Sequence, residues 1–470
     1  MVKKAKMKTV LLTLSSPAVF RNLFFFPESA FFQLKDCLNL NKNLRAVFLV
    51  YPKDYNKYAY LFKDNIGGRL ILEEITVKYP KTFLEKIFRF FYSYLIYTGT
   101  TRLMASIGTR PDEPPAGGRA YLAPLKRFIS VTFGRSSFIR LKLIPSLFLV
   151  IIKDRPFKKF FDRYNPELIF ISHLYGWFDA LLLAEAKRRN IPTIGMPAGW
   201  DHLDKYYLPF KVDSLLIPSE QMKQAAILHQ SYKPESVQII GHPYFDFITD
   251  QEYWFTREKL FESLKFPSGA KFILYISGSA YCPDEPDIIE TILKWADEKK
   301  FEEDVYLVLR PYLGGRSKDR EFDEKKFEGF HNHPRVRFYQ RESWADLDGS
   351  IYYENLMRHA DAIITVYSTA FLEAAAFDRP LLAIAFDGYK KRPFNRSLRR
   401  FELMEHFKEV IKTGALKTAR DFEELFKILN DYFRDPSIGH KERERVREEF
   451  CYKLDGQASR RLIEVVMSKL

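Results

Sequence analysis

One stretch, residues 352–388, limits the possible folds of this chain more than any other. It reads YYENLMRHADAIITVYSTAFLEAAAFDRPLLAIAFDG. The apolar run Ala362–Val366 has the length of a buried strand, and a second run follows at Leu381–Phe386. Between them, Ala370–Phe377 has the composition of a helix, which Asp378-Arg379-Pro380 ends. Strand, crossover helix and strand predict two parallel buried strands, and therefore an α/β fold.

The turn before the predicted helix carries candidate ligand-binding residues. Ser368 and Thr369 precede the helix, so we expect their hydroxyls to cap its first turn. Free amides at a helix start, at the carboxyl edge of a parallel sheet, are a common phosphate site. Glu373 lies about one turn into the helix, near the same edge. We therefore predict a diphosphate at Ser368 and Thr369 and ribose hydroxyls at Glu373; the alternative is a plain helix cap with a solvated glutamate.

The length of 470 residues favours two domains. Strands and helices alternate from Pro166, and a second alternating series opens at Lys271–Ile276. We expect a Rossmann-like domain over residues 1–243, a second over 244–445, and a C-terminal helix in 446–470 that packs toward the first domain. Their parallel sheets would face a central cleft, where ligands of such folds collect.

Further candidates for binding the donor follow strands of the second series. Ser277, Gly278 and Ser279 come directly after its first strand, and glycine permits a ligand to approach the backbone. Arg310 ends a later strand, where a guanidinium suits a phosphate clamp, although a surface salt bridge fits equally. At the domain junction, Gly241, His242 and Pro243 form either a simple turn or a hinge that lines the cleft; we favour the hinge.

Four residues of the first series are candidate general bases. His173 follows the strand Pro166–Ser172, and Asp179 lies shortly after it. Asp201 and His202 follow the next strand. Each alone is more often structural than catalytic, but all four lie at one sheet edge. We expect this set to contain the base that deprotonates an acceptor hydroxyl.

No metal ion or separate cofactor is expected beyond the donor substrate. Asp346-Leu347-Asp348 has the spacing of a DxD metal motif. This spacing often occurs by chance, and the start of a helix explains it better. The three cysteines, Cys37, Cys282 and Cys451, lie far apart and have no metal spacing. They also argue against a disulfide framework, which favours a reducing cytoplasm.

The charge of the chain is distributed unevenly. Residues 1–245 hold 36 Lys+Arg and 19 Asp+Glu, and the remainder holds 38 and 41, so the first half carries the whole excess of the net +14. Such a basic half predicts an acidic partner: anionic lipid head groups, a phosphorylated lipid carrier or nucleic acid. Nucleic acid is disfavoured because no nucleic-acid motif is present. The alternative is a scattered basic surface that serves only solubility.

Two segments suggest that a membrane surface is the acidic partner. Phe83–Tyr97 reads FLEKIFRFFYSYLIY, which fits a buried core helix or a helix that lies on a membrane. Residues 128–161 are basic and apolar as well. No apolar stretch reaches the ~18 residues of a membrane span. We interpret the early basic and apolar run as a first strand rather than a signal peptide, and expect a cytoplasmic protein, peripheral on the inner face of the membrane.

Four motifs resemble those of one superfamily. They are VYSTAFLEAAAFDRPLLAI (366–384), IIGHPYFD (239–246), GWDHLDK (199–205) and DGQASRRLIEVV (455–466). Together they resemble segments of GT-B glycosyltransferases, near the CDP-glycerol glycerophosphotransferase-like group of bacterial surface-polysaccharide synthesis and related epimerase-like proteins. The resemblance covers about residues 165–470. Gly199 and His202 depart from the Ser and Asn usual in the third motif.

The resemblance implies a nucleotide-binding second domain and an acceptor-binding first domain. It implies a metal-independent glycosyltransferase that moves a sugar from a nucleotide-diphosphate donor to a lipid-linked or growing surface glycan. Glu373, where the glycerophosphotransferases carry Asp, favours a nucleotide-sugar donor. The alternatives are a CDP-glycerol-type glycerophosphotransferase, a sugar-nucleotide epimerase, or a non-catalytic scaffold protein of the same fold.

Overall fold

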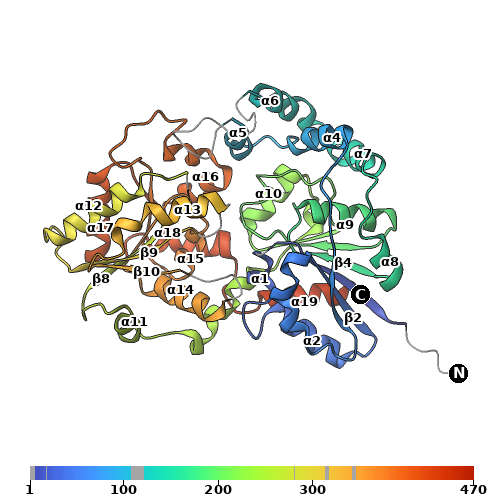
Figure 1. The fold of residues 1–470 in the computed structure, drawn as a ribbon, viewed down its shortest axis with the longest axis horizontal. Coiled ribbons are helices and arrows are strands. Elements are labelled where there is room, and N and C mark those ends of the chain that lie inside the picture. Colours follow the sequence, from blue (N-terminus) through green and yellow to red (C-terminus); the bar gives the residue numbers. More distant parts are fainter. Residues whose placement is uncertain (1–5, 17, 107–120, 280, 313–316, 341–345) are drawn as a thin grey trace. The chain divides into compact units, whose positions relative to one another are not determined.

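The chain forms two compact units, each built around one parallel sheet (Figure 1). The computed structural model describes residues 6–16, 18–106, 121–279, 281–312, 317–340 and 346–470. Unit 1 takes in Met1–Thr98, Leu125–Asp250 and Tyr452–Leu470, and unit 2 takes in Gly99–Pro124 and Gln251–Cys451. The predicted α/β fold with two parallel sheets is confirmed, whereas a cleft between the sheets stays a prediction.

The sheet of unit 1 has the order β3-β2-β1-β4-β5-β6-β7, and all of its pairs are parallel. Its strands are β1 (Lys8–Leu14), β2 (Leu44–Val50), β3 (Leu70–Glu74), β4 (Leu168–Ile171), β5 (Thr193–Gly195), β6 (Ser214–Ile217) and β7 (Val237–Ile239). The apolar run near the start of the chain is therefore strand β1, as expected, and it lies between β2 and β4 inside the sheet. Strand β3 has only one fully buried residue, Leu70, which explains why its sequence gave no strand signal.

The sheet of unit 2 has the order β10-β9-β8-β11-β12-β13, again parallel throughout. Its strands are β8 (Lys271–Ile276), β9 (Val305–Arg310), β10 (Val336–Phe338), β11 (Ala362–Thr365), β12 (Leu381–Ile384) and β13 (Leu416–Ala419). The two strands predicted in 352–388 are β11 and β12, and they pair directly. Every residue of both is buried, as expected for inner strands of a parallel sheet.

Helices cover both sheets. Those of unit 1 are α1 (Ala18–Leu23), α2 (Ala30–Leu40), α3 (Tyr55–Ala59), α4 (Phe83–Ser93), α6 (Ala123–Thr132, mostly in this unit), α7 (Ile144–Ile151), α8 (Lys158–Tyr164), α9 (Trp177–Arg188), α10 (Glu220–Gln230) and α19 (Ala458–Ser468). Those of unit 2 are α5 (Gly99–Ser106), α11 (Arg257–Leu264), α12 (Glu285–Asp297), α13 (Ser317–Lys326), α14 (Leu347–His359), α15 (Ala370–Ala376), α16 (Glu405–Lys412), α17 (Phe422–Arg434) and α18 (His440–Val446).

Helix α4 differs from the expected buried core helix. It ends at Ser93 rather than Tyr97 and buries Phe88 and Tyr92. Phe83, Leu84 and Ile87 are 79%, 60% and 48% exposed. The core interpretation is therefore wrong for the first turns of this helix.

Two segments belong to a unit that the order of the sequence does not suggest. Helix α5 comes from the first half of the chain but belongs to unit 2. The amide of Glu405 donates a hydrogen bond of 2.9 Å to Thr100 Oγ1. A Cβ at Gly99 would lie 2.1 Å from the carbonyl oxygen of Leu403, so only glycine fits this approach. The second segment, residues 452–470 with helix α19, belongs to unit 1, the unit toward which we expected the C-terminal helix of 446–470 to pack.

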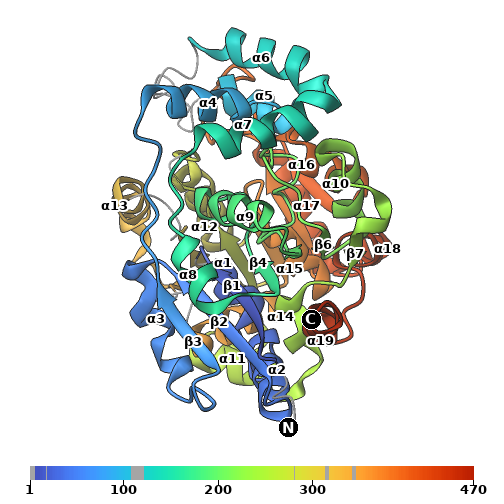
Figure 2. The same cartoon turned by 90° about the vertical axis from the view of Figure 1, so that its right-hand side faces the viewer.

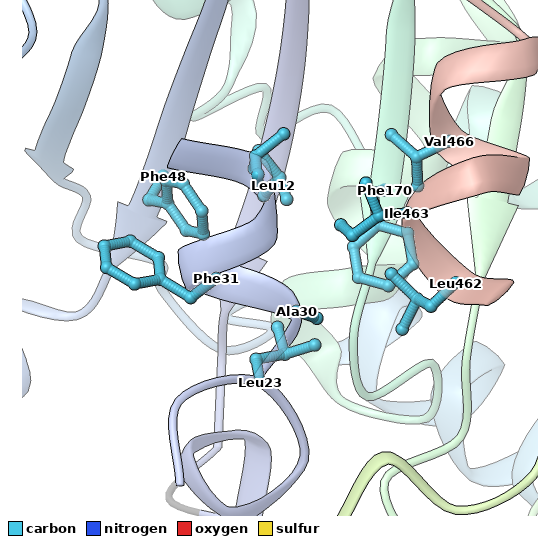
Figure 3. Close-up of a pocket in the computed structure, with 10 residues that line it drawn as sticks. Leu12, Leu23, Ala30, Phe31, Phe48, Phe170, Leu462, Ile463 and Val466 are labelled. Atoms are coloured by element: carbon cyan, nitrogen blue, oxygen red, sulfur yellow. The ribbon is translucent and has the colours of Figure 1, made fainter. Parts of the chain in front are cut away.

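Helix α19 packs on the sheet of unit 1. Its side chains Leu462, Ile463 and Val466 line a small apolar space together with Leu12 of β1 and Phe170 of β4 (Figure 3). All five side chains are at most 7% exposed. Burial of these side chains is the main apolar contribution that holds the end of the chain in unit 1.

The carboxylate of Asp246 fixes the start of α19. It accepts hydrogen bonds from the amides of Ala458 (2.8 Å) and Ser459 (2.6 Å). Burial raises the pKa of Asp246, and the two amides oppose this by favouring the ionised form. These bonds join the motifs IIGHPYFD and DGQASRRLIEVV, which the sequence separates by more than 200 residues.

The residues predicted to form a hinge lie beside this contact. Gly241 has a φ of +89°, and a Cβ there would lie 3.1 Å from the Cβ of Ala458. Pro243 opens a short 3-10 turn, Pro243–Thr249, and His242 directly precedes it. All three residues belong to unit 1. Their role as a hinge stays a prediction.

We expect Asp246→Ala to lower the free energy of unfolding by about 2 kcal/mol, because two buried amides lose a charged acceptor. Urea unfolding followed by circular dichroism measures the change. Asp154→Ala is the matched control, since Asp154 is an exposed aspartate of the same unit. Equal stability of the two variants would contradict the role of Asp246.

Candidate active site

The first cluster of predicted residues lies at the carboxyl ends of β4 and β5 in unit 1. His173 lies in the turn between β4 and α9, and its Nδ1 lies 3.2 Å from Oδ2 of Asp179 in the first turn of α9. The same oxygen accepts a hydrogen bond of 3.1 Å from Ser15 Oγ and one of 3.3 Å from the amide of Gly176. Asp179 is fully buried. The structure thus brings His173 and Asp179 together as a pair.

This pairing determines which nitrogen of His173 can accept a proton. The carboxylate of Asp179 accepts, so Nδ1 carries the hydrogen and Nε2 carries the lone pair. The second oxygen of Asp179, Oδ1, is buried and has no hydrogen-bond partner within the described part of the chain. A buried carboxylate that orients an imidazole is the usual arrangement around a histidine base.

The backbone next to His173 is strained. Leu174 has a φ of 77°, in the left-handed region that leucine rarely adopts. Its side chain packs so tightly on Gly195 of β5 that a Cβ there would lie 2.5 Å from Leu174 Cδ2. Conformations of this kind cost of order 1–3 kcal/mol and concentrate at functional sites.

His202 and Asp201 lie close by but are already engaged. Nδ1 of His202 accepts a hydrogen bond of 3.0 Å from the amide of Gly199, so the ring hydrogen is on Nε2. Burial lowers the pKa of His202 to about 3, although Asp201 opposes the shift. Asp201 itself forms an ion pair with Lys205. His202 is therefore neutral near pH 7, and the lone pair that it could use as a base is occupied.

Tyrosines, which sequence reasoning missed, line this cluster. The ring of Tyr175 lies 3.9 Å from the ring of His173 and 4.2 Å from that of His202, measured between centroids. Its other neighbour is Tyr206, stacked at 4.7 Å with an interplanar angle of 6°. Burial raises the pKa of Tyr175, so its hydroxyl stays protonated. Among so many tyrosines, no local pattern distinguishes these two.

The second cluster lies in unit 2 and joins two predicted residues. Arg310, at the end of β9, holds its guanidinium 4.4 Å from the centroid of the Tyr353 ring. The hydroxyl of Tyr353, on α14, donates a hydrogen bond of 3.1 Å to Oε2 of Glu373. Glu373 is only 8% exposed, so the alternative of a solvated glutamate is wrong. Tyr353 was not predicted, although it connects the two residues that were.

The turn before α15 agrees with the prediction in part. The helix begins at Ala370, directly after Thr369, as expected. Ser368 Oγ accepts a hydrogen bond of 3.3 Å from the amide of Ala370. Thr369 makes no capping hydrogen bond and is exposed, so its predicted capping role is wrong.

Ser277, Gly278 and Ser279 follow β8 as predicted, but packing explains the glycine. A Cβ at Gly278 would lie 2.6 Å from Cys282 Sγ and from Val366 Cγ2. Its amide donates a hydrogen bond of 3.0 Å to Glu285 Oε1. The glycine is therefore needed to fit among buried neighbours, whether or not a ligand approaches.

The DxD motif has a structural role at its first residue. Asp346 Oδ1 accepts a hydrogen bond of 2.9 Å from the amide of Gly349 and so caps the start of α14. Within the described residues, no three His, Cys, Asp or Glu side chains are grouped so that they could hold a metal ion. Independence from metal stays a prediction.

The low pKa of His202 predicts a pH-dependent stability. The folded protein keeps this ring neutral down to about pH 3, while the unfolded chain takes up a proton near pH 6.5. The contribution of His202 to the free energy of unfolding is therefore unchanged above pH 6.5. Below pH 6.5 the free energy of unfolding falls by about 1 kcal/mol per pH unit, because only the unfolded chain binds this proton. In thermal unfolding between pH 7 and pH 4, His202→Asn should show a smaller loss than the wild type; parallel pH profiles would contradict the assignment.

Comparison with known proteins supports the fold over the whole chain and the family over one part. A family model described as CDP-Glycerol:Poly(glycerophosphate) glycerophosphotransferase matches residues 326–468. No curated protein matches the chain.

Three solved structures resemble the chain over nearly its full length. The UDP-GlcNAc 2-epimerase of Methanocaldococcus jannaschii is 11% identical with a TM-score of 0.52, and 98% of this chain and 100% of that chain are covered. The Neisseria meningitidis enzyme bound to UDP-GlcNAc is 12% identical (TM-score 0.51; 98% and 100% covered). S. aureus MnaA with UDP is 15% identical (TM-score 0.51; 99% and 98% covered). The predicted GT-B-like fold is thereby confirmed, and residues 326–468 carry the signature of the CDP-glycerol glycerophosphotransferase family, as the resemblance implied.

Proposed function

We propose that this protein is a glycosyltransferase that moves a sugar from a nucleotide-diphosphate donor to a lipid-linked or growing cell-surface glycan. The observation that carries the proposal is the cluster of Arg310, Tyr353 and Glu373 at the carboxyl edge of the second sheet. Tyr353 and Glu373 fall within the part that the transferase family model matches. The likeness to S. aureus MnaA with UDP and to an epimerase bound to UDP-GlcNAc supports a nucleotide sugar as the donor class.

In this proposal the second cluster binds the nucleotide. Arg310 contributes a positive charge whose position is set by the face of the Tyr353 ring. Glu373, oriented by the Tyr353 hydroxyl, accepts from the ribose hydroxyls. The diphosphate lies at the turn of Ser368 and Thr369, where backbone amides and the exposed Thr369 hydroxyl serve as donors.

The first cluster supplies the base. His173 fits this role best among the four predicted residues, because Asp179 holds its Nδ1 and leaves the Nε2 lone pair for the acceptor hydroxyl. Asp179 then acts as a positioning residue. His202 and Asp201 help to shape the site, since Gly199 and Lys205 already engage them.

During transfer, negative charge develops on the departing diphosphate while the acceptor oxygen attacks the sugar carbon. Arg310 and the amides at the turn before α15 stabilise that charge without a metal ion. His173 takes the proton from the acceptor hydroxyl, so that the oxygen attacks as its bond to hydrogen weakens.

Two alternative reactions are each supported by one observation. The family match favours transfer of glycerol phosphate from CDP-glycerol. The structural likeness favours a sugar-nucleotide epimerase. A scaffold protein of this fold would bind nucleotide without turnover.

The nucleotide site is tested by calorimetry with whichever of UDP, CDP, GDP and ADP raises the melting temperature most. We expect Glu373→Ala to raise Kd by about tenfold or more, because a buried charged acceptor is lost. Tyr353→Phe, which keeps the ring beneath Arg310, should raise Kd by a smaller factor. Glu409→Ala, at an exposed helix position of the same unit, is the control. Identical Kd values for all the variants would show that the nucleotide does not bind at this cluster.

The reaction is tested by product analysis with a panel of nucleotide sugars and CDP-glycerol. We expect sugar transfer, and we expect His173→Asn to lower kcat by at least about 100-fold with unchanged nucleotide Kd. His202→Asn should retain most of the activity. Release of an epimerised sugar, or transfer of glycerol phosphate, would replace the proposed reaction, and nucleotide binding without turnover on every donor would favour the scaffold.

A further inference from the structure

Helices α4, α6 and α7 of unit 1 form a layer at one end of the unit (Figure 2). Phe88 of α4 packs on Phe148 of α7, with ring centroids 6.2 Å apart. Ser130 Oγ of α6 donates a hydrogen bond of 2.7 Å to the carbonyl oxygen of Tyr94, just after α4. The segment 133–143, which connects α6 to α7, joins them, since Phe133 packs on Phe91 of α4 with ring centroids 5.3 Å apart. The three helices and this segment therefore make one surface, which we call the α4 layer.

The α4 layer exposes large apolar side chains. Phe83, Leu84 and Ile87 occupy adjacent positions on the first turns of α4 and are all exposed. The remaining exposed apolar side chains of the layer are Leu125, Phe128, Phe133, Phe138, Leu141, Leu143 and Val150. Most of the exposed large apolar side chains of unit 1 belong to this layer. Concentrated exposure of this kind marks an interaction surface.

The same layer is strongly basic. Residues 123–153 contain six Lys or Arg and no Asp or Glu. Of these, Arg127, Arg135 and Lys142 lie exposed beside the apolar side chains. Basic and large apolar side chains on short helices are typical of segments that lie in the interface of an anionic membrane. Among the described residues, no helix is long and apolar enough to cross a bilayer, so contact would be with the membrane surface.

A cavity opens at this layer. It has a volume of about 340 Å³ and is lined by Tyr79, Pro80, Lys86, Arg89, Phe90, Ser93 and Tyr94. Lys86, Phe90 and Ser93 follow one stripe of α4, at i, i+4 and i+7. No carboxylate lines the cavity.

Two cations of the cavity are available to an anion. The guanidinium of Arg89 lies 5.1 Å from the ring centroid of Tyr79 and 5.4 Å from that of Trp177, which holds its position. Lys86 is exposed. The nearby Glu85 does not line the cavity, and its carboxylate is engaged by the amides of Lys81 and Thr82. Two cations beside aromatic walls suit a phosphate carried on an organic group.

We propose that the α4 layer docks on an anionic phospholipid membrane, with the phosphate of one lipid head group bound between Lys86 and Arg89. The exposed apolar side chains then enter the region between head groups and acyl chains. A nucleic acid would match the charge but leave these apolar side chains in water. The inference goes beyond the proposed function, since it uses no residue of the donor or base clusters.

The test is flotation of the purified full-length protein with vesicles. One set contains phosphatidylcholine alone, and the other contains phosphatidylcholine mixed with phosphatidylglycerol. We expect binding to the anionic set at low salt, weakened in high salt. Absence of binding to both sets at low salt would overturn the proposal, and so would retention on heparin without any vesicle binding, which would favour a soluble acidic partner.

Matched variants distinguish binding at the cavity from general attraction by the basic surface. Lys86→Glu should lower partitioning by about fivefold or more, because it reverses a charge at the membrane surface. Lys42→Glu makes the same change of net charge at an exposed site outside the layer and should have little effect. Phe83→Ser should weaken binding, and Leu40→Ser, at an exposed leucine of α2, should not. Equal losses within each pair would overturn the assignment to this layer.

Two controls keep the outcome independent of folding and of the proposed reaction. All four substituted side chains are exposed, so circular dichroism should show unchanged folding. Nucleotide Kd for Lys86→Glu should equal that of the wild type. Soluble glycerol phosphate should compete weakly with vesicles, because it lacks the acyl chains; complete displacement by it would show that the cavity binds free phosphate rather than a membrane.

Discussion

The second cluster, in unit 2, depends on the parallel pairing of β8 with its two neighbours, β9 and β11. Ile276, the last residue of β8, lies opposite Arg310 on one side and Thr365 on the other. Because all three strands run in the same direction, the segments that follow them emerge at one edge of the sheet. Arg310 and the turn of Ser368 and Thr369 therefore lie at the same edge, although about 58 residues separate them in the sequence.

The same rule assembles the first cluster in unit 1. Ile171 of β4 lies opposite Gly195 of β5, which brings the segments after both strands, with His173 and His202, to one edge. Strand β1 pairs with β4 from the other side, so Ser15 reaches Asp179. The left-handed backbone of Leu174 is the strained feature at this point, and packing of its side chain on Gly195 helps to hold it.

A large part of the fold was predictable from local pattern. Apolar runs and the residues that end helices and strands predicted most of it. They identified the strands in 352–388, the helix between them and the two alternating series. Edge strand β3 and the exposure of Phe83 were not, because apolar composition alone does not say whether a side chain meets a core or solvent. The unit to which α5 belongs was not predictable either, since the fit of Gly99 against Leu403 joins residues about 300 positions apart.

For the candidate site, the sequence by itself determined the residue types and the sheet edges on which they lie. It identified His173, Asp179, Arg310 and Glu373, because polar residues after buried parallel strands share an edge. Only the tertiary structure decided which of them are coupled. Tyr353 joins Arg310 to Glu373, Asp179 orients His173, and Gly199 occupies the lone pair of His202. The contacts of Tyr353 join separate elements of unit 2, whereas Asp179 and Gly199 lie only six and three residues from the histidines that they engage. Even these short-range pairs depend on the exact backbone turn and side-chain direction, which the residue types alone do not specify.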